Sequence, residues 1–192
     1  MISPFEYIVV LISIILGMGI TQVLSGTANI VSRWDQVTLY WPHTIWIVLV
    51  FVFHFQEWWV TYELRTYEYW RLPVFLFIIL YPMNLYILAR LLFPIRWSKE
   101  SISFKEYYFA NCRKLFLLVF TLSVLSVLQN LIIGGAALSE EYLQSIVASL
   151  SFVVVIFNVR KAWVHEAIAA VLLLAAIASF AVQWNTLLIV NT

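Results

Sequence analysis

The sequence predicts an all-α, polytopic integral membrane protein: a bundle of six transmembrane helices that forms a single domain over residues 1–192. Three observations carry this prediction. Hydrophobic residues make up 64% of the chain and charged residues only 11%, against about 25% charged residues in a soluble domain. Six apolar stretches each approach the ~20 residues that a membrane helix requires. All eleven Lys and Arg lie between these stretches or near their ends. We therefore expect no room for a soluble catalytic domain, and no enzyme.

The expected helices cover residues 5–31, 40–62, 71–93, 104–133, 142–159 and 164–190. Pro42 falls in the first turn of the second helix, where proline is tolerated, and Pro94 ends the third. Pro82 lies inside the third helix and should kink it. Ser103 and Glu106 have the spacing of a capping box, which places the start of the fourth helix there.

The last two helices are separated only by Arg160, Lys161 and Ala162, with neither glycine nor proline to mark a turn. A single helix over 142–190 would be ~73 Å long at 1.5 Å per residue. The apolar core of a bilayer is only ~30 Å thick. We therefore expect the chain to reverse near Arg160.

The basic residues predict an orientation. Nine of the eleven Lys and Arg fall on one side of the zigzag: in the loop near residue 33, at Arg90, in the segment 96–114 and near residue 160. Because cytoplasmic loops carry the excess of Lys and Arg, these loops and Cys112 should be cytosolic and both termini outside. We expect a bacterial inner (plasma) membrane. The basic segment 96–114 should attract anionic lipids from the surrounding bilayer.

One polar stripe stands out on the second helix. Its members, spaced by three or four residues, are His43, Ile47, Val50, His54, Glu57 and Thr61. An ionisable group at membrane depth is costly, so it usually faces the bundle interior or water. One interpretation is a path for a proton or small cation, with His54 and Glu57 at its outer end. The other is that these two side chains lie near the outer headgroups, beside Trp58 and Trp59, and form local hydrogen bonds.

Polar residues of the third and fourth helices also allow two interpretations. Asn84 follows the Pro82 kink, and Asn130 shares a face of the fourth helix with Ser123 and Ser126. They can line a polar cavity, or they can form hydrogen bonds between helices.

The first helix carries small residues at four-residue intervals: Ser13, Gly17, Thr21 and Ser25. Such a pattern lets helix backbones approach closely and predicts a packing seam, within the chain or in an oligomer. The alternative is a face that binds a solute through Thr21 and the adjacent Gln22.

His43 and His165 lie near the cytosolic ends of their helices, which makes them weak candidates for bis-histidine haem ligation. Residues 165–169 begin like the zinc-protease motif HExxH, but Ala169 replaces its second histidine, so no metal site is expected. A net charge of +1 gives no sign of a nucleic-acid partner.

Three functions remain open. The first is the passage or sensing of a small cation or proton along the polar stripe of the second helix. The second is a non-catalytic accessory or scaffold subunit that forms a homo-oligomer or binds a membrane partner. The third is a haem-binding membrane redox subunit.

Overall fold

The computed structural model of the chain describes residues 3–97 and 101–186. Within them lie six α-helices: α1 (Pro4–Ser32), α2 (Trp41–Thr61), α3 (Leu72–Leu91), α4 (Phe104–Ile132), α5 (Tyr142–Phe157) and α6 (Ala162–Thr186). Short 3-10 segments and two strands, β1 (Val37–Thr38) and β2 (Ile102–Ser103), join them. The all-α prediction is confirmed, and each described helix boundary falls within a few residues of its expected place. Lys99 and the expected end of the last helix, 187–190, lie outside the described residues.

Five of these helices are long and apolar enough to cross a membrane. The exception is α5, whose 16 residues extend about 24 Å at 1.5 Å per residue. That length is shorter than a bilayer core of about 30 Å. The number of spans therefore rests on α5, and six spans stays a prediction.

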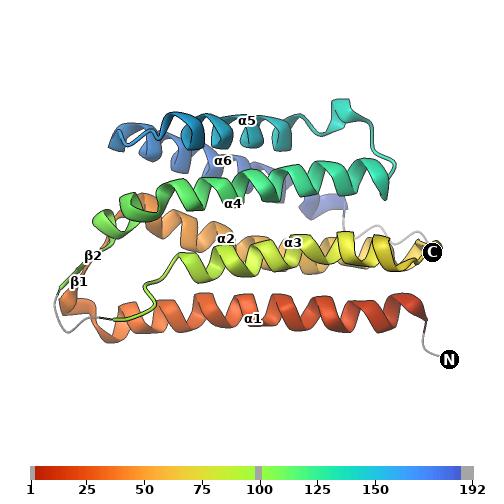
Figure 1. The fold of residues 1–192 in the computed structure, drawn as a ribbon, viewed down its shortest axis with the longest axis horizontal. Helices are drawn as coiled ribbons and strands as arrows, with labels where there is room; N and C mark the ends of the chain where they lie inside the picture. The colour runs from red at the N-terminus through yellow and green to blue at the C-terminus, as the bar shows by residue number, and fades with distance from the viewer. Residues whose placement is uncertain (1–2, 98–100, 187–192) are drawn as a thin grey trace.

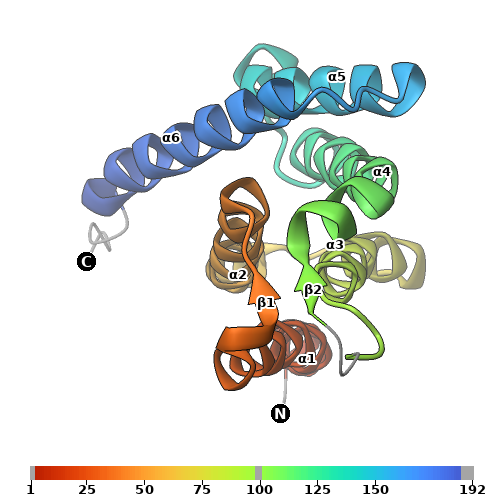
Figure 2. The same ribbon diagram turned by 90° about the vertical axis from the view of Figure 1, so that its left-hand side faces the viewer.

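The first four helices run back and forth along one axis (Figure 1), and α5 and α6 are tilted away from it (Figure 2). We call the end where α1 begins the terminal end, and the opposite end, which holds β1 and β2, the strand end. At the strand end, Val37 pairs with Ile102 and Thr38 with Ser103 in a parallel two-stranded sheet. This sheet joins the α1–α2 connection to the α3–α4 connection, and no pattern in the sequence predicts it. The Ser103 hydroxyl caps α4 as expected, accepting a hydrogen bond from the Glu106 amide at 3.3 Å.

The reversal between α5 and α6 occurs at Asn158. This residue caps α5 with φ 44° and ψ 48°, the left-handed conformation. Asparagine adopts that conformation more readily than most residues, so it ends a helix in the way glycine usually does. The expected reversal near Arg160 is thus present two residues earlier. Beyond it, α6 crosses the bundle obliquely and packs on α2 (Figure 2).

The small-residue pattern of α1 does not face the other helices of this chain. Gly17, Thr21 and Ser25 are exposed, and Ser13 is half-buried. A Cβ atom added to Gly17 would meet nothing within 4 Å. The close contacts come from Gly19 and Gly26 instead, where an added Cβ would overlap the rings of His54 and Phe93. As a seam within the chain the prediction is wrong, because the helix turns its larger apolar residues inward; as a contact between chains it stays a prediction.

Pro82 shapes the contact between α3 and α4. Proline has no N–H, so the carbonyl of Ile78, one turn earlier, lacks its helical partner. The side chain of Gln129 on α4 supplies one: Nε2 donates to Ile78 O at 3.2 Å and to Phe77 O at 3.0 Å. Asn84 Nδ2 likewise donates to Leu118 O at 3.1 Å. These polar residues therefore bind one helix to the other.

We expect Gln129→Leu to lower the free energy of unfolding by about 1–2 kcal/mol, because it leaves the Ile78 carbonyl without a donor. Thermal unfolding in detergent measures the change. Adding Pro82→Ala restores an N–H for the Ile78 carbonyl, so Gln129→Leu should cost less in that background. An equal cost in both backgrounds would show that Gln129 does not act through the proline-freed carbonyl.

Candidate functional site

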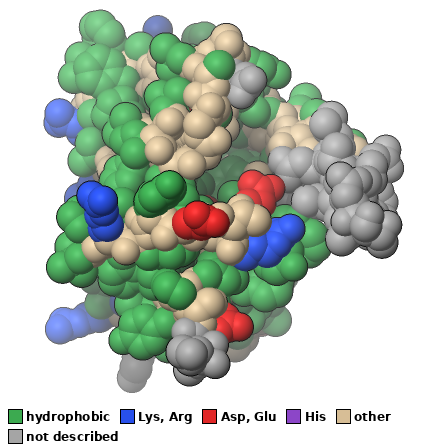
Figure 3. All heavy atoms as spheres, turned by 90° about the vertical axis from the view of Figure 1, so that its right-hand side faces the viewer, with side chains coloured by type: hydrophobic (Ala, Val, Ile, Leu, Met, Phe, Trp, Pro, Cys, Tyr) green, Lys and Arg blue, Asp and Glu red, His purple; other side chains and the backbone are tan. Residues whose placement is uncertain are grey.

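A cavity of about 800 Å³ lies among α2, α3, α4, α5 and α6. Its position follows from the packing of the helices. α2 packs on α3 and α6, whereas α4 packs on α3 and α5, so the space between α2 and α4 is left open. Lining residues extend from the terminal end, at Glu63 and Gly134, to Trp46 and Leu88 deep in the bundle. The terminal end shows a hollow with glutamate side chains beside it (Figure 3).

The cavity wall is polar near the terminal end and apolar at its floor. Carboxylates come from Glu57 and Glu63, and no Lys or Arg is among the described lining residues. The other polar lining groups are amides and hydroxyls: Gln56, Gln129, Asn130, Gln144, Thr61, Tyr81, Ser123, Ser126 and Ser179. At the floor lie Trp46, Leu88, Val119 and Leu122. The lining therefore carries a negative charge, and this charge is concentrated at the terminal end of the cavity.

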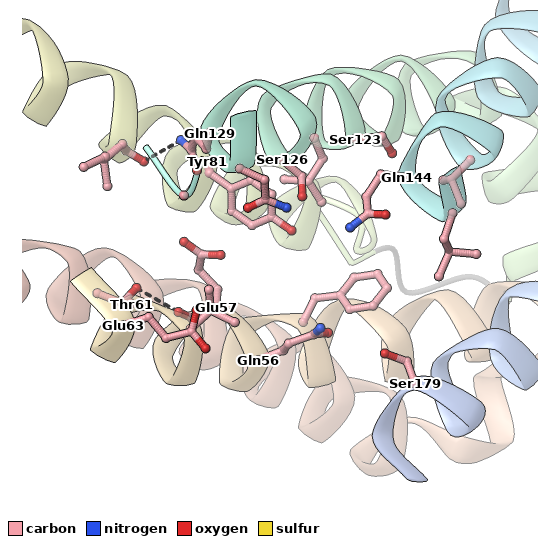
Figure 4. A pocket seen from close by; sticks show the side chains of 18 of the residues that line it. Gln56, Glu57, Thr61, Glu63, Tyr81, Ser123, Ser126, Gln129, Gln144 and Ser179 are labelled. Atoms are coloured by element: carbon pink, nitrogen blue, oxygen red, sulfur yellow. Dashed lines mark hydrogen bonds between the residues drawn. The ribbon is translucent and has the colours of Figure 1, made fainter. Parts of the chain in front are cut away.

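Glu57 is the carboxylate that extends across the cavity near its terminal end. Its side chain extends from α2 toward the wall formed by α3 and α4, where Tyr81 and Gln129 lie (Figure 4). The Thr61 hydroxyl donates to the Glu57 backbone carbonyl at 2.8 Å, a contact within α2 that does not involve the carboxylate. Trp46 lies eleven residues earlier on α2, which places it about 16 Å deeper along the helix axis.

Asn130 lines the same cavity and links two of the helices that form its wall. Its Nδ2 donates to Glu141 Oε1 at 2.9 Å, which joins the end of α4 to the start of α5. Glu141 is buried, with 4% of its surface exposed. Of the residues expected to form a pathway, the structure thus brings Glu57, Thr61 and Asn130 together at one cavity. Asn84 does not line it and bonds to α4 instead.

His54 belongs to the same stripe as Glu57 but faces another helix. It is fully buried, and its Nδ1 donates to Val50 O at 2.6 Å. Its Nε2 lies against Gly19 of α1 and has no hydrogen-bond partner within the described part of the chain. The stripe is the buried face of α2, as expected, yet it divides between a helix contact at His54 and the cavity at Glu57. His54 therefore fits the interpretation in which it bonds locally.

His43 of α2 and His165 of α6 both pack on the ring of Tyr108, near the strand end. His43 Nε2 donates to Leu92 O at 2.9 Å, and its ring lies 6.2 Å from that of Tyr108. His165 Nε2 donates to Val159 O at 2.8 Å, so its Nδ1 is the acceptor for the Tyr108 hydroxyl at 2.9 Å. Both nitrogens of His165 are thus engaged by the protein. This arrangement gives no support to a haem between the two rings.

Aromatic side chains close the bundle between the cavity floor and the strand end. The ring centroids of Trp46 and Phe116 lie 5.6 Å apart, and those of Phe116 and His165 lie 5.5 Å apart. Tyr40 packs on Tyr108 at 5.5 Å. Burial raises the pKa of the Tyr40 phenol, and the nearby Glu166 carboxylate raises it further. The strand end is therefore filled by rings, whereas the terminal end holds the polar cavity.

The sequence pattern missed much of the cavity wall. Gln56, Tyr81 and Gln144 come from three different helices and share no common spacing. The available signal was that each is a polar residue within or beside an apolar stretch, where such residues need a partner or water. Among the described residues, no group of three or more His, Cys, Asp or Glu side chains is placed to hold a metal ion.

Comparison of the chain with protein-family models, with curated proteins and with solved structures finds no match.

Proposed function

We propose that the protein passes or senses a small cation or proton through the cavity, with Glu57 as the group that carries the charge. The observation behind this proposal is a carboxylate that extends from an apolar helix into a space of about 800 Å³ with no Lys or Arg among its described lining residues. Placing a carboxylate at membrane depth costs several kcal/mol unless it meets water or a partner. A cavity that opens at one end supplies the water, and a cation supplies the partner.

The test is flux through the full chain in liposomes. Proton movement is followed with an enclosed pH-sensitive dye, and potassium or sodium movement with ion-selective dyes, at several values of pH and membrane voltage. We expect flux above that of protein-free liposomes for at least one of these ions. If no ion moves under any of these conditions, the cavity is not a pathway, and only a sensing function without passage would remain.

A second candidate function is an accessory or scaffold subunit. The observation that favours it is the outward face of α1, where Gly17, Thr21 and Ser25 are exposed and no side chain approaches Gly17. Small residues on an exposed helix face allow another membrane helix to approach closely. Chemical cross-linking of the protein in its native membrane tests this: a cross-linked homodimer or heterodimer through α1 is the expected product.

The proposed orientation places the strand end in the cytosol and the terminal end outside, in a bacterial plasma membrane. Arg96, Lys105, Arg113 and Lys114 are exposed on the strand-end half, where they are available to anionic lipid headgroups. Cys112, however, is buried, with 2% of its surface exposed. Thiol labelling of the natural cysteine would therefore report burial rather than sidedness.

Two exposed positions give a clean measurement of sidedness. In a Cys112→Ala background, Glu68→Cys at the terminal end should react with a membrane-impermeant maleimide in intact cells. Asp35→Cys at the strand end should react only after the membrane is opened. The reverse pattern would invert the topology.

A further inference from the structure

The size of the cavity bears on what it binds. A proton or a bare metal ion needs far less space than about 800 Å³, whereas cavities that bind small organic molecules measure about 300–1,000 Å³. Hard metal cations also require six or more oxygen ligands held close together. Among the described residues, no cluster of three His, Cys, Asp or Glu side chains offers the start of such a set.

The charge of the lining selects the sign of the ligand. Glu57 and Glu63 give two carboxylates, and the described lining residues include no basic side chain to neutralise them. The basic residue nearest in sequence to Glu63 is Arg65, whose guanidinium lies over the ring of Tyr62 at 4.0 Å and donates to the Tyr62 carbonyl at 3.2 Å. An anion would therefore be repelled at the entrance, and a cation attracted.

The aromatic residues select the kind of cation. Phe53, Tyr67, Tyr81 and Trp46 all line the cavity, from its entrance to its floor. Aromatic ring faces attract organic cations, and quaternary ammonium groups in particular. Tyr81 lies across the cavity from Glu57, so a cationic nitrogen between them would meet a carboxylate on one side and a phenol on the other. The apolar floor beyond, about 16 Å deeper at Trp46, has room for an apolar body.

We propose that the cavity binds an organic monocation, with its ammonium group at Glu57 and Tyr81 and its apolar part directed toward Trp46. The proposal rests on the proposed function, because it names the class of cation that the same cavity receives. It goes beyond that function in requiring a ligand with an apolar body and in assigning Tyr81 to its recognition.

The probe is benzyltrimethylammonium, which carries a permanent charge and an aromatic body, titrated into the full chain in nanodiscs by calorimetry. We expect saturable one-to-one binding in the micromolar to low millimolar range. Benzyl alcohol, which keeps the ring but lacks the charge, and sodium, which keeps the charge but lacks the body, should each bind at least tenfold more weakly. Equal binding of benzyl alcohol, or no saturable binding of the probe, would overturn the proposal.

Three variants locate the site. Glu57→Gln should weaken binding of the probe at least tenfold, and Tyr81→Leu should weaken it severalfold. Glu68→Gln removes a carboxylate at the same end of the bundle that does not line the cavity, so it should leave the affinity unchanged. Ser126→Trp fills the cavity while keeping both carboxylates, and should abolish binding in protein that retains its melting temperature. Unchanged affinity in both Glu57→Gln and Ser126→Trp would place the probe elsewhere.

The liposome measurement separates this inference from the function on which it rests. Proton or metal-ion flux in a protein that does not bind the probe would uphold the pathway and overturn the organic cation. Saturable binding that depends on Glu57, in a protein that passes no ion, would uphold the organic cation and leave the cavity as a binding or sensing site.

Discussion

Glu57→Gln is expected to reduce cation or proton flux in liposomes at least tenfold. The substitution keeps the shape of the side chain but removes one of the two carboxylates that line the cavity, the one that extends toward α3 and α4. A neutral amide can neither take up a proton nor balance a cation in a bundle where an unpaired charge costs several kcal/mol. The initial rate of dye response, at equal amounts of reconstituted protein, measures the effect.

Two variants control this prediction. Glu68→Gln lies outside the cavity at the same end and should keep the flux of the natural protein. His54→Ala should also keep most of it in protein that folds, because His54 faces Gly19 rather than the cavity. The pathway interpretation of the sequence pattern required both His54 and Glu57 to carry flux. Flux that survives Glu57→Gln but disappears in folded His54→Ala would restore the stripe as the pathway and reject the cavity.

Gly19→Ala is expected to destabilise the protein by about 1–3 kcal/mol, the usual cost of overpacking a filled interior. A single methyl group at Gly19 would overlap the imidazole of His54. That ring has no exposed surface and is held by its bond to Val50, so it cannot move into open space. Thermal unfolding in detergent should show a lower melting temperature than that of the natural protein.

Gly17→Ala is the matched control, two residues away on the same helix. An added Cβ there meets no atom within 4 Å, and alanine favours a helix over glycine by about 1 kcal/mol. Gly17→Ala should therefore leave the melting temperature of the monomer unchanged or raise it. If the two variants behaved alike, the close approach of α1 and α2 at Gly19 would be rejected. Adding His54→Ala should reduce the cost of Gly19→Ala, because it removes the ring that the methyl group meets.

The sequence by itself determined the helical class of the chain. Stretches that enter lipid must satisfy their backbone hydrogen bonds internally, and continuous apolar stretches of about 20 residues do so as helices. Local signals determined several boundaries in the same way: Ser103 begins α4 through its own side chain, and Pro82 marks the place where α3 needs a donor from outside. Such features depend on neighbours in sequence, so a pattern can predict them.

Only the tertiary structure decided which residues meet. Helical spacing placed His54 and Glu57 on one face of α2, but that face contacts α1 at His54 and borders the cavity at Glu57. The small-residue pattern of α1 predicted a seam at Gly17, whereas the close contacts lie at Gly19 and Gly26. The cavity itself is built from Tyr81, Ser126 and Gln144 of three helices, together with Glu57. A periodic pattern gives the face of one helix; the rotation and tilt of its neighbours, which depend on packing between distant segments, decide what that face touches.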